Sequence, residues 1–146
     1  MADQTAAQTT AQTTAQTTAQ TTGLTWKIEL IPLAVQDVDR AKDFYGNRVG
    51  WNVDHDQTVH EGLRFVQVTP QGSACSVCFG IGLGMMPEGS SQMIQVVVPS
   101  AEAARDHLRD RGVECSDVDD QPWGRFVGFS DPDGNRWVLQ ELPARP

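Results

Sequence analysis

The chain has few basic residues and no long apolar run. Its 146 residues include 11 Lys and Arg against 19 Asp and Glu, a formal net charge of −8. A surface with this balance lacks the basic patch that releases phosphate counterions, so we expect neither nucleic acid nor a membrane as partner. No apolar stretch reaches the ~18 residues of a transmembrane helix, and three Cys are too few for a disulfide scaffold.

The beginning of the chain lacks the features of a targeting signal and of a folded segment. It has neither a charged start nor a following apolar run, which predicts no secretory signal and a location in the reducing cytoplasm. Residues 1–23 are built mainly from repeats of Ala-Gln-Thr-Thr. Because these side chains offer little apolar surface to bury, we predict a disordered tail and a folded domain over residues 24–146.

The rest of the chain is an internal repeat. Shifted by 62 residues, it aligns without a gap, and Thr69–Gly72 falls on Asp131–Gly134 as the same Pro-x-Gly turn. Apolar runs and helix caps then predict a βαβββ module over residues 24–80, a linker over 80–89 and a second module over 90–142. The expected helices cover about residues 38–48 and 100–111, and the expected strands cover residues 27–35, 51–54, 63–69, 73–79, 92–98, 113–116, 125–130 and 135–141.

Paired modules of this kind resemble the vicinal oxygen chelate superfamily of glyoxalases, bleomycin resistance proteins and dioxygenases. The resemblance rests on Val35–Tyr45 (VQDVDRAKDFY), on Val49–Trp51, and on Phe129–Trp137 (FSDPDGNRW). It implies an α+β fold in which two βαβββ modules form a cup-shaped, eight-stranded mixed sheet around a small molecule. In such proteins two modules or two chains share the cup, so we also expect a homodimer.

The resemblance also implies four positions for metal ligands inside the cup. Counting from the helix cap and from the turn glycines places Leu30, Ser76, Gln92 and Val138 there. Two hydrocarbon side chains, a hydroxyl and an amide are too weak to offset the dehydration of a divalent cation. We therefore predict no metal and no cofactor, and a likeness to the metal-free, bleomycin-resistance branch.

The function predicted from these residues is metal-independent binding or sequestration of an apolar, antibiotic-like small molecule. Polar groups in an otherwise apolar pocket, aromatic rings for stacking and one cation are typical of such sites. The predicted ligand-binding residues are Ser76, Gln92, Trp123, Arg125 and Phe126. Satisfying neighbouring backbone groups is the alternative role for Ser76 and Gln92, and pairing with Asp119 or Asp120 is the alternative for Arg125.

An enzyme of the same superfamily, a lyase, an isomerase or a dioxygenase, is the alternative function. Its metal could come from the imidazoles and carboxylates of Asp54–Glu61, although we expect this segment to be a solvated loop. Acid-base chemistry could instead come from Glu29 or Glu141. Cys75 and Cys78 are spaced like a redox pair, but strand alternation places positions three apart on opposite faces.

Overall fold

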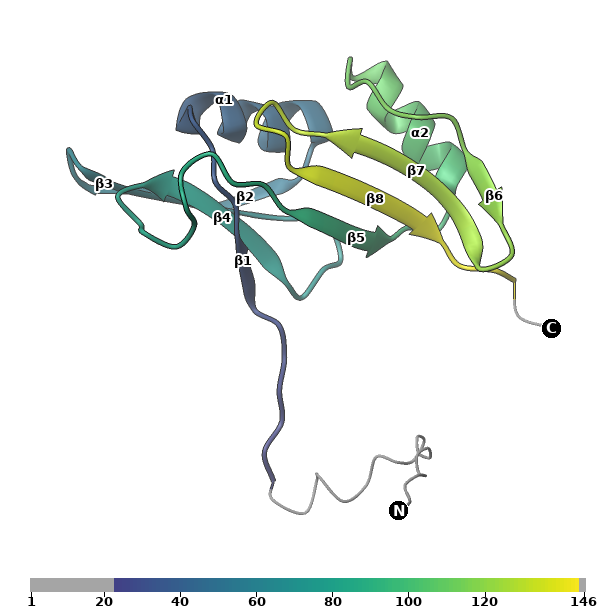
Figure 1. The fold of residues 1–146 in the computed structure, drawn as a ribbon, viewed down its shortest axis with the longest axis horizontal. Helices are drawn as coiled ribbons and strands as arrows, with labels where there is room; N and C mark the ends of the chain where they lie inside the picture. Colours follow the sequence, from purple (N-terminus) through teal and green to yellow (C-terminus); the bar gives the residue numbers. More distant parts are fainter. Residues whose placement is uncertain (1–22, 145–146) are drawn as a thin grey trace.

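The computed structural model describes residues 23–144, which form two modules side by side (Figure 1). The first consists of β1 (Leu30–Pro32), α1 (Val38–Asp43), the π-helical turn η3 (Phe44–Val49), β2 (Asn52–His60), β3 (Leu63–Thr69) and β4 (Ser76–Ile81). The second consists of β5 (Met93–Val97), α2 (Ala101–Asp110), β6 (Asp119–Gln121), β7 (Gly124–Ser130) and β8 (Arg136–Glu141). The α+β class and the repeated βαβββ order are confirmed, whereas the prediction for residues 1–22 lies outside the described residues.

The strands form two four-stranded sheets rather than a single sheet of eight. Their orders are β1-β4-β3-β2 and β5-β8-β7-β6. In each sheet the first strand pairs in parallel with the last strand of its module, and the other pairs are antiparallel. The sheets are therefore mixed, as expected, and β1 and β5 are both edge strands.

One helix covers one face of each sheet. The Asp37 side chain accepts from the backbone N–H of Arg40 to begin α1, and Ser100 does the same for α2 through Ala103. Helix α1 packs on β4, and α2 packs on β7 and β8. We call the face under the helix the covered face and the opposite face the open face.

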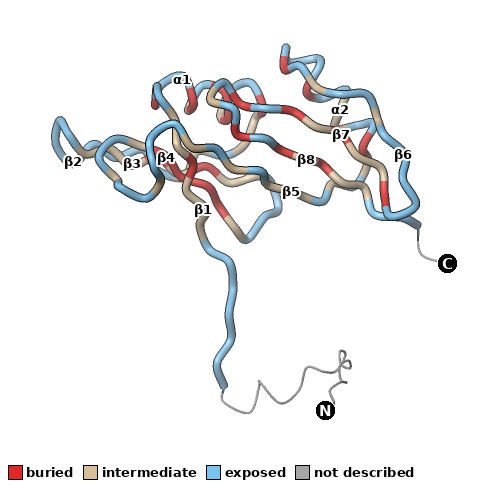
Figure 2. The backbone as a smooth tube through the Cα atoms, in the orientation of Figure 1, coloured by how far each residue is buried: buried red, intermediate tan, exposed pale blue. Residues whose placement is uncertain are grey.

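Both modules contribute to one hydrophobic core, whose buried segments lie on α1, η3, β3, β4, α2, β7 and β8 (Figure 2). At its centre the Tyr45 hydroxyl donates to Asp131 Oδ2 at 2.6 Å and accepts from Trp137 Nε1 at 3.0 Å. Asn135 Nδ2 donates to the same Asp131 oxygen at 2.8 Å. We call Tyr45, Asp131, Asn135 and Trp137 the buried network. It ties the first helix to the last turn of the chain.

The prediction that the repeat needs no gap is wrong before Gly50. Among the helices, the apolar inward positions Val38, Ala41 and Tyr45 correspond to Ala101, Ala104 and Leu108, an offset of 63. In the first strands, Leu33 donates to the Cys78 carbonyl as Val98 donates to the Gln140 carbonyl, an offset of 65. The second module has a shorter connection from strand to helix, and the first has the π-helical turn, which adds a residue before its glycine.

Two segments differ from their predicted structure. Residues 113–116 form no strand, and the short edge strand β6 lies further along, at Asp119–Gln121. The charged segment that we expected to be a loop belongs to β2, which runs to His60. In the described part of the chain, no helix combines the length and the apolar character that crossing a bilayer requires.

Candidate ligand-binding site

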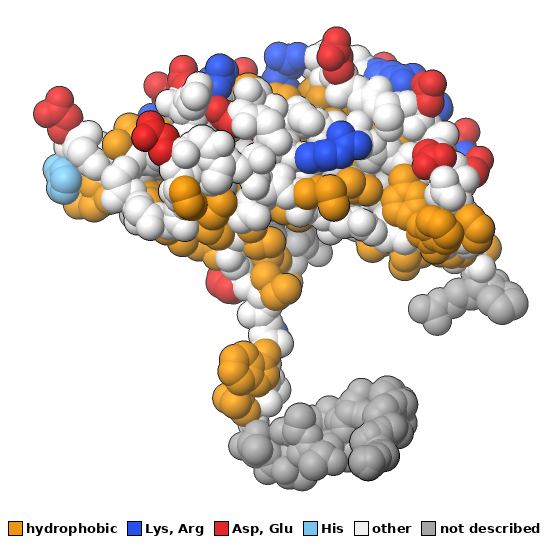
Figure 3. Space-filling model, in the orientation of Figure 1, with side chains coloured by type: hydrophobic (Ala, Val, Ile, Leu, Met, Phe, Trp, Pro, Cys, Tyr) orange, Lys and Arg blue, Asp and Glu red, His pale blue; other side chains and the backbone are white. Residues whose placement is uncertain are grey.

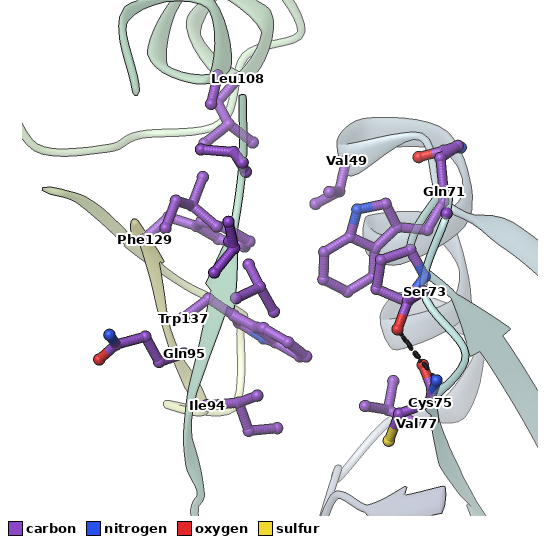
Figure 4. A pocket seen from close by; sticks show the side chains of 18 of the residues that line it. Val49, Gln71, Ser73, Cys75, Val77, Ile94, Gln95, Leu108, Phe129 and Trp137 are labelled. Atoms are coloured by element: carbon purple, nitrogen blue, oxygen red, sulfur yellow. Dashed lines mark hydrogen bonds between the residues drawn. The ribbon is translucent and has the colours of Figure 1, made fainter. Parts of the chain in front are cut away.

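An apolar cavity of about 650 Å³ lies between the two modules. Figure 4 shows its two walls. Val49 and Val77 stand on the side of the first module, and Ile94, Phe129 and Trp137 stand on the side of the second. Trp51 of the first module also lines the cavity. Val77, Phe129 and Trp137 belong to the covered faces, and Gln95 and Val97 of the edge strand β5 also line this inter-module cavity.

A few polar side chains mark the mouth of the cavity. Gln71 and Ser73 come from the turn between β3 and β4, and His107 comes from α2. All three are exposed, whereas the aromatic wall at Phe129 and Trp137 is buried. An apolar interior with a few polar groups at one end is typical of small-molecule sites.

The predicted residue Ser76 lies on the open face of the first sheet, outside the cavity. Its hydroxyl is 2.6 Å from the Thr69 hydroxyl, and Thr69 also contacts Asp54 Oδ2. Because the Asp54 carboxylate can only accept, Thr69 donates to Asp54 and Ser76 donates to Thr69. The Thr69 hydroxyl holds the pKa of the Asp54 carboxyl below its usual range. Ser76 is thus a member of an ordered polar chain.

Gln92 does not occupy the position opposite Val138 that the repeat predicted for it. It precedes β5, and its Nε2 donates to the carbonyl of Pro32 at 3.1 Å. In register, Leu30 pairs with Ser76 and Gln95 pairs with Val138. Gln95 is therefore the structural counterpart of Leu30. Gln95 is among the residues that line the cavity, but its amide is directed away from the opposite wall (Figure 4) and donates to Gln140 Oε1 at 2.7 Å.

Arg125 lies on the covered face of the second sheet, in an ion cluster that both modules contain. It pairs with Asp120 of β6 at 2.6 Å and with Glu102 of α2 at 3.4 Å. In the first module Arg64 of β3 pairs with Asp56 of β2 at 2.9 Å and with Asp39 of α1 at 2.8 Å. An arginine that joins a strand to a helix in both modules is explained by the fold. The structure does not bring it to the cavity.

The two aromatic residues of the predicted set also lie away from the cavity. Trp123 is 62% exposed in the turn between β6 and β7. Phe126 alternates with the buried Val127, which places it on the open face of the second sheet. The five predicted residues therefore occupy different parts of the surface and are not brought together within one chain.

The candidate metal ligands of β2 are separated and engaged elsewhere. Asp54 belongs to the open face with Thr69, whereas Asp56 pairs with Lys42 and Arg64 beside α1. Among residues 23–144, no three His, Cys, Asp or Glu side chains are grouped so that they could hold a metal ion. Burial raises the pKa of the Cys75 and Cys78 thiols, which disfavours the thiolates that redox chemistry needs.

Sequence reasoning missed most of the cavity lining. The predicted ligand-binding set contained none of Trp51, Phe129, Trp137 and Gln71. The useful signal was present in the repeat, because Gln71 and Ser73 occupy the same turn as Asp133 and Asn135 of the second module. Because the turn of the second module contacts the first module, the equivalent turn of the first module is expected to face the second module.

Comparisons with known proteins agree with this architecture. The family model described as Glyoxalase/Bleomycin resistance protein/Dioxygenase superfamily matches residues 27–139. An uncharacterized protein of Bacillus subtilis, YetH, is 29% identical over 119 residues, which cover 79% of this chain and 98% of YetH.

Two solved structures from Streptomyces sp. CB03234 are similar to the chain. TnmS3, described as an antibiotic binding protein, is 33% identical with a TM-score of 0.71, covering 82% of this chain and 98% of TnmS3. A protein described as a glyoxalase/bleomycin resistance protein is 35% identical with a TM-score of 0.68, covering 79% of this chain and all of the other.

Proposed function

Because the chain belongs to the Glyoxalase/Bleomycin resistance protein/Dioxygenase superfamily, we propose that it binds an apolar, antibiotic-like small molecule in the inter-module cavity without a metal ion. The observation that carries the proposal is an apolar space of about 650 Å³ walled by the rings of Trp51, Phe129 and Trp137. Flat ligands stack well on such rings. The likeness to TnmS3, an antibiotic binding protein, supports the same ligand class.

The proposal of metal independence rests on the four positions where metal-using relatives are expected to place ligands. In register these are Leu30, Ser76, Gln95 and Val138. None carries an imidazole or a carboxylate. The free energy that a divalent cation loses on dehydration would therefore exceed the free energy that it gains by coordinating these groups. All three cysteines are free thiols, which suits the reducing cytoplasm that we propose as the location.

We further propose that the protein acts as a homodimer joined through the edge strands. Within the described chain β5 bonds only to β8, so its other edge presents unpaired backbone groups. Met93 and Val97 on that strand are 68% and 61% exposed. Hydrophobic side chains also gather on the underside of the molecule and along the extended segment that carries Trp26 and Ile28 (Figure 3). A second copy is the partner that offers the same surface.

A filled cavity tests the binding proposal. Calorimetric titration with 2-methoxynaphthalene, a flat apolar probe, should show saturable binding to the natural chain. Val96→Phe places a ring into the space that Val96 lines and should abolish this binding. Val59→Phe, at a residue of β2 that is 68% exposed, is the matched control and should bind normally. Equal binding by both variants would place the ligand elsewhere.

Two measurements test the other parts of the proposal. Elemental analysis of the purified protein should find no stoichiometric transition metal, and finding one would favour the enzymes of the superfamily. Sedimentation velocity should show a dimer that Val97→Lys converts to monomer, because the substitution places a charge on the exposed edge. A monomeric natural chain would overturn the dimer.

A further inference from the structure

Two arginines bind four backbone carbonyls at the helix ends that meet between the modules. Arg48 donates to the carbonyls of Arg111 and Gly112, and Arg111 donates to those of Arg48 at 2.7 Å and Asn47 at 2.5 Å. This reciprocal pair satisfies acceptors that a helix end leaves open. The carbonyls of the next two residues of the first module, Val49 and Gly50, are not bound by an arginine and lie at the mouth of the cavity.

Those two carbonyls accept hydrogen bonds from two side chains that line the cavity. Gln71 Nε2 donates to the Gly50 carbonyl at 2.6 Å, and His107 Nε2 lies 2.7 Å from the Val49 carbonyl. Since a carbonyl only accepts, the proton of the neutral imidazole is on Nε2 and Nδ1 is left as an acceptor. The Ser73 hydroxyl likewise donates its hydrogen bond to the carbonyl of Cys75 at 2.7 Å. The side chains at the mouth of the cavity therefore offer a ligand mainly hydrogen-bond acceptors.

The donors that remain around the cavity are few. Trp137 Nε1 already donates to Tyr45. In the part of the chain that the structure describes, the Trp51 indole N–H has no hydrogen-bond partner, and Gln71 and Gln95 each retain the second N–H of their amides. None of these is an ionised donor, so when His107 is neutral a ligand carboxylate finds no cation among the lining residues.

We infer that the cavity selects an apolar aromatic ligand that carries a neutral hydrogen-bond donor, a hydroxyl or an N–H, directed at Gln71 Oε1 and His107 Nδ1. The inference rests on the proposed function, because it assigns a ligand class to the same cavity. A donor gains a hydrogen bond at the mouth, whereas an ether or a carboxylate meets acceptors and leaves its own oxygens unpaired.

Three probes of one ring system test this selectivity by calorimetry: 2-naphthol, 2-methoxynaphthalene and 2-naphthoate. The hydroxyl should bind about tenfold more tightly than the ether, which is the effect of one net hydrogen bond, and the carboxylate should bind most weakly. The double variant Gln71→Met, His107→Phe removes both acceptors. It should weaken 2-naphthol to the affinity of the ether and leave 2-methoxynaphthalene unchanged. The control Gln121→Met, His60→Phe changes the same residue types on exposed strand positions and should keep the preference.

The outcomes separate this inference from the function it rests on. Equal affinities of the natural chain for naphthol and ether, a preference for naphthoate, or a naphthol preference that survives the double variant would each overturn the inference while leaving the binding function intact. Absence of binding by all three probes would overturn both. Thermal unfolding of each variant checks that the substitutions act on the mouth and not on the fold.

Discussion

The buried network and the inter-module cavity occupy equivalent places in the two halves of the molecule. The reciprocal contacts of Arg48 and Arg111 show that the modules are related by an approximate twofold axis. This relation pairs Tyr45 with Leu108, Asn135 with Ser73 and Trp137 with Cys75. The first member of each pair fills the network, and the second lines the cavity.

The difference between the two places is one of side-chain volume and hydrogen bonding. A tyrosine and a tryptophan close the first interface, and a leucine and a cysteine leave the second one open. The two turns themselves are alike, because each carries a proline and a glycine of positive φ. A duplicated fold thus obtains one rigid junction and one binding space by changing a few side chains.

The largest loss of unfolding free energy is expected from a substitution that breaks the buried network. Asp131 is 5% exposed and accepts hydrogen bonds from Tyr45, Asn135 and the backbone N–H of Asp133. Asp131→Ala leaves these buried donors unsatisfied and should cost about 3 kcal/mol of unfolding free energy, measured with urea. Thr69→Ala, which removes a hydroxyl from the polar chain on the open face of the first sheet, should cost about 1 kcal/mol. Similar losses would mean that the buried network contributes no more to stability than this polar chain.

Tyr45→Phe removes a single oxygen from the same network and should cost about 1.5 kcal/mol. Burial, followed by the charge of Asp131, raises the pKa of the Tyr45 hydroxyl far above its ordinary value of 10.0. The folded state therefore holds this proton more tightly than the unfolded state, and its contribution is complete below pH 10.0 and declines as the pH rises further. Thermal unfolding should show the natural chain losing stability above pH 10 more steeply than Tyr45→Phe. Parallel curves would contradict this.

Added volume distinguishes the open side from the packed side. Val96→Phe extends into the cavity and should change the unfolding free energy by no more than about 0.5 kcal/mol. Val127→Phe, at a residue that is completely buried under α2, should cost about 2 kcal/mol because no space receives the ring. Urea unfolding compares the two. If Val96→Phe were the more damaging variant, the space between the modules would be too small to bind a ligand.

The fold was largely predictable because its signals are local. Turn glycines, the caps Asp37 and Ser100, and alternating apolar residues each report on a few neighbours, and together they predicted the α+β class and the repeated βαβββ order. The counterpart of Leu30 was misplaced because the first module has both a longer connection from strand to helix and an extra residue in its π-helical turn, and these two differences add to a shift of three residues from the offset of 62 to the offset of 65.

The candidate site was harder to predict because it depends on how two surfaces meet. Arg125 could have been assigned to the covered face, since it alternates with the apolar pair Val127 and Phe129. The cavity itself carries no such pattern. Its walls are ordinary core residues, and only the pairing of Tyr45 with Leu108 across the repeat indicates that one side is left unfilled.

The smallest change in unfolding free energy is expected from substitutions in the two ion clusters, around Arg64 and around Arg125. The side chain of Asp56 is 22% exposed between Arg64 and Lys42, and hydrogen bonds first from Arg64 and then from Lys42 hold its pKa below the ordinary 3.8. Asp56→Asn should cost about 0.5 kcal/mol at neutral pH, and the loss should shrink in high salt. Because a lowered pKa stabilises the folded chain above 3.8 and this contribution fades as the pH falls, the variant and the natural chain should converge in acid. Asp120→Asn removes the partner of Arg125, but Asp120 is 73% exposed and its loss should be smaller still. A larger loss at Asp120 would show that Arg125 has a role beyond joining β7 to β6 and α2.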